Sequence, residues 1–143
     1  MKEIITRWKE NPIISPDMVR GANAVFNSGV ARFEDRFVAV LRVESRQGYQ
    51  GMRVAWSNDG IHFDVNDDPV LVPDREPFVT YEEAIYDPRI TRIDDTYYIC
   101  YAAENKYGCQ VAVSKTRDFR SFEKVAIASQ PCRTTQTTPS AST

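Results

Sequence analysis

The sequence predicts an all-β fold, because short apolar runs alternate with turn signals and no stretch has the spacing of an amphipathic helix. The apolar runs occupy residues 24–26, 30–33, 37–41, 52–57 and 97–101. Between them lie turn signals such as Asn58-Asp59-Gly60, a sequence that favours a tight connection between strands. A second observation, an internal repeat, indicates how the strands are arranged.

The repeat relates two halves of the chain at a spacing close to sixty residues. The matched segments are 30–35 with 90–95, 37–41 with 97–101, Glu44 with Glu104, 54–57 with 111–114, and 59–63 with 118–122. Each unit holds about four short antiparallel strands, and a four-strand repeat of this length is typical of a β-propeller blade. We therefore predict blades at about 21–66 and 81–128.

The remaining segments have the composition of connections and ends. Residues 1–20 carry Pro12 and Pro16 and predict an extended lead-in. Residues 66–80 are acidic and contain prolines, which predicts a connecting loop. Residues 129–143 hold no large apolar side chain and predict a disordered tail, with translation out of frame as a hypothesis for its origin.

Composition bounds the class of protein. The chain has 143 residues, of which 42% are hydrophobic and 27% charged, as in one soluble globular domain. A net charge of −2 argues against a nucleic-acid partner, and no apolar run approaches a membrane span. Three cysteines without CxxC spacing and a single histidine, His62, indicate reduced thiols in the cytoplasm and no metal or other cofactor. We expect His62 to be a surface strand residue.

One candidate for catalysis stands out. Asp87 precedes Pro88, which favours extended backbone at the entry to a strand. An acid held in this way suits proton transfer, although a role in capping a turn is the alternative. Asn27 lies sixty positions earlier and so occupies the same place in the first blade. Since innermost strands line a propeller's channel, we expect Asn27 and Asp87 to face one another across a shared pocket.

The segments 26–30, 41–44, 55–63 and 86–91, in this order and spacing, resemble glycoside hydrolase family 130. Members of this family are mostly β-mannoside phosphorylases, with some β-mannosidases, built on a five-bladed β-propeller. The resemblance implies that the chain is the N-terminal part of such a propeller, about two blades. It also implies that most phosphate-binding side chains belong to later blades.

The resemblance assigns roles to four residues of this sequence. It implies that Asp87 is the catalytic proton donor, and that Asn27 and Ser28 hold the sugar next to the cleaved bond. Arg42 matches an arginine that binds hydroxyls of the same sugar. The sequence departs from the family at Tyr86, where glutamate is common.

The implied reaction is inverting phosphorolysis of a β-mannoside oligosaccharide, with inorganic phosphate as co-substrate and α-mannose 1-phosphate as product. An inverting hydrolase needs two carboxylates, whereas phosphate is itself a charged nucleophile and needs only the acid. We expect Asp87 to be buried in the channel, because a general acid has to hold its proton near neutral pH. The alternatives are a propeller β-mannosidase that uses water and a non-catalytic carbohydrate-binding propeller piece.

Two blades do not close a ring, and their open strand edges favour self-association. We therefore expect this chain alone to be poorly soluble or oligomeric, without measurable phosphorolysis. The full-length family enzyme is expected to be a homo-oligomer.

Overall fold

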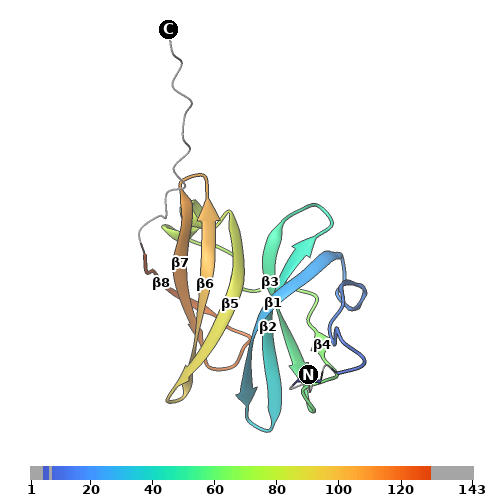
Figure 1. Ribbon diagram of the computed structural model, residues 1–143. Coiled ribbons are helices and arrows are strands. Elements are labelled where there is room, and N and C mark those ends of the chain that lie inside the picture. The colour runs from blue at the N-terminus through green and yellow to red at the C-terminus, as the bar shows by residue number, and fades with distance from the viewer. Residues whose placement is uncertain (1–4, 7, 130–143) are drawn as a thin grey trace.

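The computed structural model describes residues 5, 6 and 8–129, and it confirms the all-β fold. Two four-stranded antiparallel sheets stand side by side, and each follows the order of the chain (Figure 1). The first sheet contains β1 (Ala22–Phe33), β2 (Arg36–Ser45), β3 (Gln50–Ser57) and β4 (Asp64–Val65), and the second contains β5 (Ala84–Ile93), β6 (Thr96–Asn105), β7 (Gly108–Thr116) and β8 (Glu123–Ile127). A meander of four strands is the form of a propeller blade.

The sixty-residue repeat is visible in the backbone. The hairpin after the first strand of each sheet turns through a residue of left-handed conformation, Glu34 with φ 55° and Asp94 with φ 54°. After the third strand, one carboxylate oxygen accepts the backbone N–H groups two and three residues later, at 2.8 Å each, in Asp59 and again in Asp118. The two sheets are therefore built from the same local geometry.

An aromatic cluster fixes the two sheets against each other. Phe33 and Trp56 come from the first sheet, Tyr97 comes from β6, and Phe119 comes from the turn between β7 and β8. The Phe119 ring is 1% exposed, and its centroid lies 5.6 Å from that of Phe33 and 4.7 Å from that of Tyr97. The Tyr97 hydroxyl donates a hydrogen bond of 2.8 Å to the Arg32 carbonyl, across the interface. Such aromatic pairs add about 0.5–1.5 kcal/mol each to the burial of their area.

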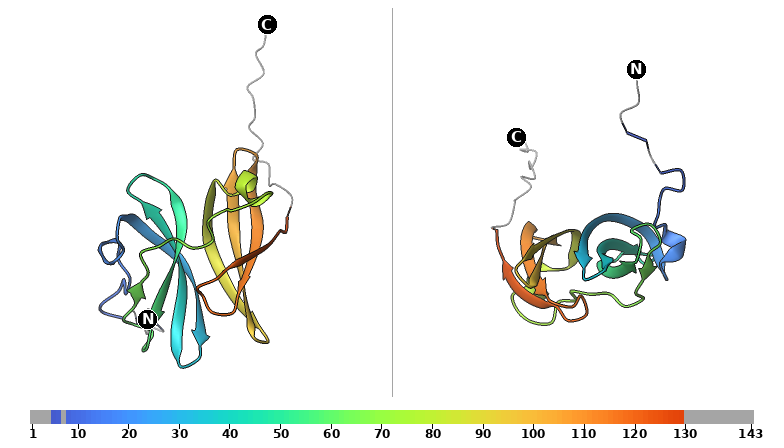
Figure 2. Two further views of the ribbon diagram at one scale, coloured as in Figure 1. Left: turned by 180° about the vertical axis from the view of Figure 1, so that it is seen from behind. Right: turned by 90° about the horizontal axis from the view of Figure 1, so that it is seen from below.

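The described residues contain two short helices: the 3₁₀-helix η1 (Pro16–Met18) before β1 and the α-helix α1 (Phe78–Tyr81) between β4 and β5. The α-helix begins inside the stretch 66–80 that the sequence predicts as a loop, because a single turn is too short to leave an apolar period. Phe78 is buried there, in the linker that runs between the sheets (Figure 2). Over the described ranges, no helix has the length and apolar character needed to cross a membrane.

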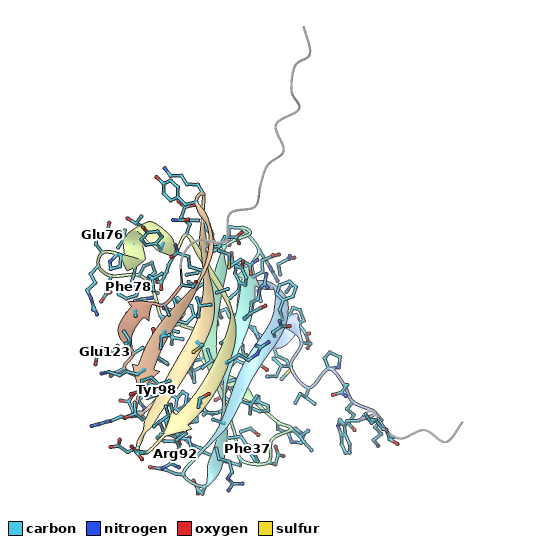
Figure 3. The ribbon with its side chains drawn as sticks, turned by 60° about the vertical axis from the view of Figure 1, so that its left-hand side comes forward. Phe37, Glu76, Phe78, Arg92, Tyr98 and Glu123 are labelled. Carbon is cyan, nitrogen blue, oxygen red and sulfur yellow. The ribbon has the colours of Figure 1, made fainter. Side chains whose placement is uncertain are left out.

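The outer faces of the two sheets differ. The lead-in covers the first sheet, where Ile14 and Val19 pack against Ala39 and Leu41. The outer face of the second sheet is open, with a hollow of about 560 Å³ lined in part by Tyr98 and Glu123 (Figure 3). The exposed apolar residues Ile93, Val111 and Val125 also belong to the second sheet.

A buried ion pair fastens the linker to the second sheet. The Glu82 carboxylate, 0% exposed, pairs with the Lys124 ammonium of β8, 4% exposed. The same ammonium donates to the Leu71 carbonyl at 2.8 Å, and the Tyr101 hydroxyl donates to Glu82 at 2.6 Å. Burial lowers the pKa of Lys124 below its ordinary value, while the hydrogen bond and charge of Glu82 oppose that shift. Both charges thus have close partners, as buried charges require.

We predict that Glu82→Leu or Lys124→Met alone lowers the free energy of unfolding by about 3–5 kcal/mol, because one charge is left buried without its partner. The double variant should regain most of this loss, since two apolar side chains leave no charge to compensate. Urea unfolding of the unsubstituted chain, the two single variants and the double variant gives the coupling energy between Glu82 and Lys124. Additive losses in the double variant would show that the pair does not act as a unit.

His62 is not in a strand, contrary to expectation: it lies in the turn before β4, and its side chain is 82% exposed. Its Nδ1 is 2.6 Å from Oδ2 of Asp59. This hydrogen bond, with the charge of Asp59, raises the pKa of His62 above the ordinary 6.5, and the same bond lowers the pKa of Asp59. The protonated imidazole is therefore favoured in the folded turn.

We predict that the His62 ring titrates in NMR with a midpoint above 6.5, and that Asp59→Asn returns the midpoint toward that value. Because the pKa is raised on folding, the pair stabilises the fold fully below the unfolded pKa, and this stabilisation is lost as the pH rises through the folded pKa. An unchanged midpoint in the variant would contradict the assignment.

Candidate functional site

The candidate site lies at bulges in the first strand of each sheet. The register of β1 against β2 shifts between Val25 and Ser28, and that of β5 against β6 shifts between Tyr86 and Arg89. A bulge adds a residue to one strand and re-aims its side chains. Asp87 occupies the second bulge with φ 56°, so its backbone is left-handed rather than extended as the following proline predicted. The bulge imposes this conformation, which aspartate tolerates better than most residues.

Arg42 connects the two sheets at this point. Its Nη1 donates to Oδ1 of Asp87 at 3.1 Å, from β2 of the first sheet to β5 of the second. Its Nε donates to the Gln50 side-chain oxygen at 3.0 Å, and the Gln50 amide donates to Glu44 at 2.7 Å. Glu44 also accepts a hydrogen bond of 2.6 Å from Asn23. Polar side chains of the first sheet thus hold the guanidinium that contacts the acid of the second sheet.

Two aromatic rings pack against the same guanidinium. The Arg42 Cζ atom lies 4.6 Å from the ring centroid of Phe26 and 4.5 Å from that of Tyr86. The Tyr86 hydroxyl donates to Glu104 at 2.9 Å and lies 3.6 Å from Sγ of Cys109. Burial, together with these two neighbours, raises the pKa of the Tyr86 phenol, which therefore stays a protonated donor at neutral pH. Cation–π contacts of this kind contribute about 0.5–2 kcal/mol.

The predicted site residues are only partly brought together. Asp87 and Arg42 form a hydrogen-bonded pair, whereas no hydrogen bond within residues 8–129 joins Asn27 to Asp87, and Asn27 is exposed. Ser28 lines a different hollow, of about 680 Å³, with Trp8 and neighbouring apolar residues. Side chains alternate along a strand, so adjacent residues reach different surroundings. The sugar-binding roles of Asn27 and Ser28 stay predictions.

The expected burial of Asp87 is not found. Its side chain is 37% exposed, so part of the carboxylate faces solvent. Sequence reasoning also assigned no role to Phe26, Gln50 or Glu104. A signal was present: Phe26 matches Tyr86 and Glu44 matches Glu104 in the sixty-residue repeat.

Two meander sheets packed through their first strands, with a polar site at the bulges in those strands, define two blades of a β-propeller. A family model described as beta-1,4-mannooligosaccharide phosphorylase matches residues 2–142. The chain therefore belongs to glycoside hydrolase family 130, as its sequence predicted.

Two characterised relatives and a solved structure support this assignment. A beta-1,4-mannooligosaccharide phosphorylase from Ruminococcus albus is 33% identical over 85% of this chain and 38% of its own length. A beta-1,2-mannobiose phosphorylase from Listeria innocua is 38% identical, over 83% of this chain and 49% of its own. A glycosyl hydrolase from Bacteroides ovatus superposes with a TM-score of 0.73 at 26% identity, over 82% of this chain and 40% of its own. The chain thus spans less than half the length of these relatives.

We predict that Gly29→Ala disturbs the site by separating the first strands of the two blades. A Cβ at Gly29 would lie 2.9 Å from Cγ1 of Ile90, and 3.1 Å from the Ile90 nitrogen and the Pro88 carbonyl oxygen. Because two of these atoms belong to the backbone, relief requires a strand to move, at a cost of about 1–3 kcal/mol in urea unfolding.

Gly51→Ala is the matched control, since no atom lies within 4 Å of a Cβ at that position. Equal unfolding midpoints for the two variants would show that the blades are not in close contact at Gly29.

Proposed function

We propose that this chain supplies part of the sugar-binding cleft of a β-mannoside phosphorylase, with Asp87 as the proton donor. The observation that carries the proposal is the hydrogen-bonded pair of Arg42 and Asp87, which joins β2 of the first blade to the bulge in β5 of the second. Two characterised relatives are phosphorylases of β-mannosides, which supports the same reaction class.

In the proposed reaction, a phosphate oxygen forms a bond to the anomeric carbon while the bond from that carbon to the glycosidic oxygen breaks. The departing oxygen takes up the proton that Asp87 supplies, directly or through a sugar hydroxyl. Inversion at the anomeric carbon gives α-mannose 1-phosphate. The part played by this chain is to place one acid, and general acid catalysis of this kind contributes about 10²- to 10⁴-fold.

Arg42 suits the neighbouring sugar-binding role. Its guanidinium carries N–H donors in one plane and no acceptor, so it can donate to sugar hydroxyls as well as to Asp87. We propose that a bound sugar accepts from N–H groups of the guanidinium other than the one that meets Asp87. Asn27 and Ser28 at the neighbouring bulge are proposed to hold the same sugar, with inorganic phosphate as co-substrate, no other cofactor, and a cytoplasmic location.

The test uses a chimera, called here the completed enzyme, in which residues 8–129 replace the matching part of the Ruminococcus albus phosphorylase. Asp87→Asn in the completed enzyme should lower kcat by about 10²- to 10⁴-fold, because the amide cannot donate the proton. Binding of β-1,4-mannobiose should persist, since the amide keeps the shape of the carboxyl group. Unchanged turnover would remove Asp87 from the role of acid.

The control is Asp35→Asn, at an exposed turn, which should leave turnover unchanged. Running the reaction with and without phosphate separates the reaction classes: phosphorolysis requires phosphate and releases mannose 1-phosphate. Release of free mannose without phosphate would instead assign the chain to the β-mannosidases. Testing β-1,2-mannobiose beside the β-1,4 isomer gives the linkage.

A further inference from the structure

The surroundings of Arg42 show a symmetry that the proposed reaction does not explain. Phe26 directly precedes Asn27, and Tyr86, sixty residues later, directly precedes Asp87. Both aromatic rings lie about 4.5 Å from the Arg42 guanidinium. The position that matches Arg42 in the second blade is Ala102, which pairs directly with Tyr86 in the sheet. One blade thus supplies the cation, and each blade supplies a ring.

The repeat also relates the two glutamates that hydrogen-bond to neighbours of the Arg42 guanidinium. Glu44 accepts from Gln50, which in turn accepts from Nε of Arg42. Glu104, the repeat partner of Glu44, accepts the hydroxyl proton of Tyr86 at 2.9 Å. Two glutamates at matching positions therefore each hold a residue that contacts Arg42.

The two rings do not use the N–H donors of Arg42, of which Nε donates to Gln50 and Nη1 to Asp87. A ring packs against the face of a guanidinium, whereas its N–H donors point outward in the plane. Neither Phe26 nor Tyr86 brings a carboxylate that would compete with Asp87 for those donors. Among the described residues, Asp87 is the one carboxylate paired with Arg42.

We propose that Tyr86, held by Glu104, is a positioning residue: its ring orients the Arg42 guanidinium so that one N–H meets Asp87 and others face the sugar. The catalytic consequence rests on the proposed function, but the orientation of Arg42 is a property of this chain alone. The two parts can therefore be tested separately.

The first test is side-chain NMR of the 143-residue chain, following the Nε–H signal of Arg42. Tyr86→Leu removes the ring and should shift this signal and speed its exchange with water, while Tyr86→Phe keeps the ring and should change it little. Tyr107→Leu, at an exposed aromatic residue of the second blade, is the matched control. A Tyr86→Leu spectrum like that of Tyr107→Leu would overturn the proposal, as would equal changes in Tyr86→Leu and Tyr86→Phe.

Glu104→Ala provides a second variant should Tyr86→Leu not fold, because Glu104 is exposed and its removal leaves the ring in place. Glu104→Ala and Tyr86→Phe lose the same hydrogen bond and keep the ring, so both should broaden the Arg42 Nε–H signal by the same small amount, less than Tyr86→Leu does. A sharp signal at its original position would count against the role of Glu104 in holding the ring.

The second test uses the completed enzyme. Tyr86→Leu should lower kcat about two- to thirty-fold, the range of one cation–π contact, and Tyr86→Phe should restore it. In an Asp87→Asn background, Tyr86→Leu should have no further effect, because it acts through the same proton donor. An undiminished effect in that background would overturn the positioning role in catalysis.

The outcomes separate the two proposals. If the NMR changes occur and Asp87→Asn leaves turnover unchanged, the proposed function fails and the orientation of Arg42 by Tyr86 stands. If Asp87→Asn abolishes turnover and the Arg42 Nε–H signal is unchanged in Tyr86→Leu, the positioning role fails and the proposed function stands.

Discussion

The apolar packing between the two blades is the constraint on which the site depends. Arg42 and Asp87 belong to different sheets, so their 3.1 Å contact exists only while those sheets keep their relative position. The aromatic cluster around Phe119 holds the interface, and the close approach of Gly29 to Ile90 brings the first strands together. Burial of aromatic side chains supplies far more free energy than a half-exposed ion pair. The ion pair is thus a consequence of the packing and not its cause.

A second constraint acts on the strand that carries the acid. Glu82 precedes β5 by two residues, and its ion pair with Lys124 anchors the chain at the start of that strand. Burying the two charges costs desolvation free energy. Hydrogen bonds from Lys124 to the Leu71 carbonyl and from the Tyr101 hydroxyl to Glu82 offset this cost. From this fixed start, the bulge at Asp87 turns the carboxylate toward Arg42. The Glu82–Lys124 pair therefore both stabilises the fold and fixes the start of the strand that carries Asp87.

Much of this arrangement follows from the repeat. Strand patterns and turn signals repeat because local backbone geometry does, so the sheets and the equivalence of Asn27 with Asp87 could be predicted. The left-handed backbone of Asp87 could not, since a bulge depends on how two strands pair. Neither could the reach of Arg42 into the second blade, where it contacts Asp87 and the Tyr86 ring. Contacts between blades are set by tertiary packing, which a pattern along one strand does not encode.

Binding of sugar at the two bulges can be measured by titrating the 143-residue chain with β-1,4-mannobiose and following it by NMR, which detects binding even at millimolar Kd. We expect chemical-shift changes confined to Asp87, Arg42 and their neighbours at the two bulges, and we expect these changes to be lost in Arg42→Ala. Changes elsewhere, for example at the open hollow beside Tyr98, or changes that persist in Arg42→Ala, would contradict this expectation.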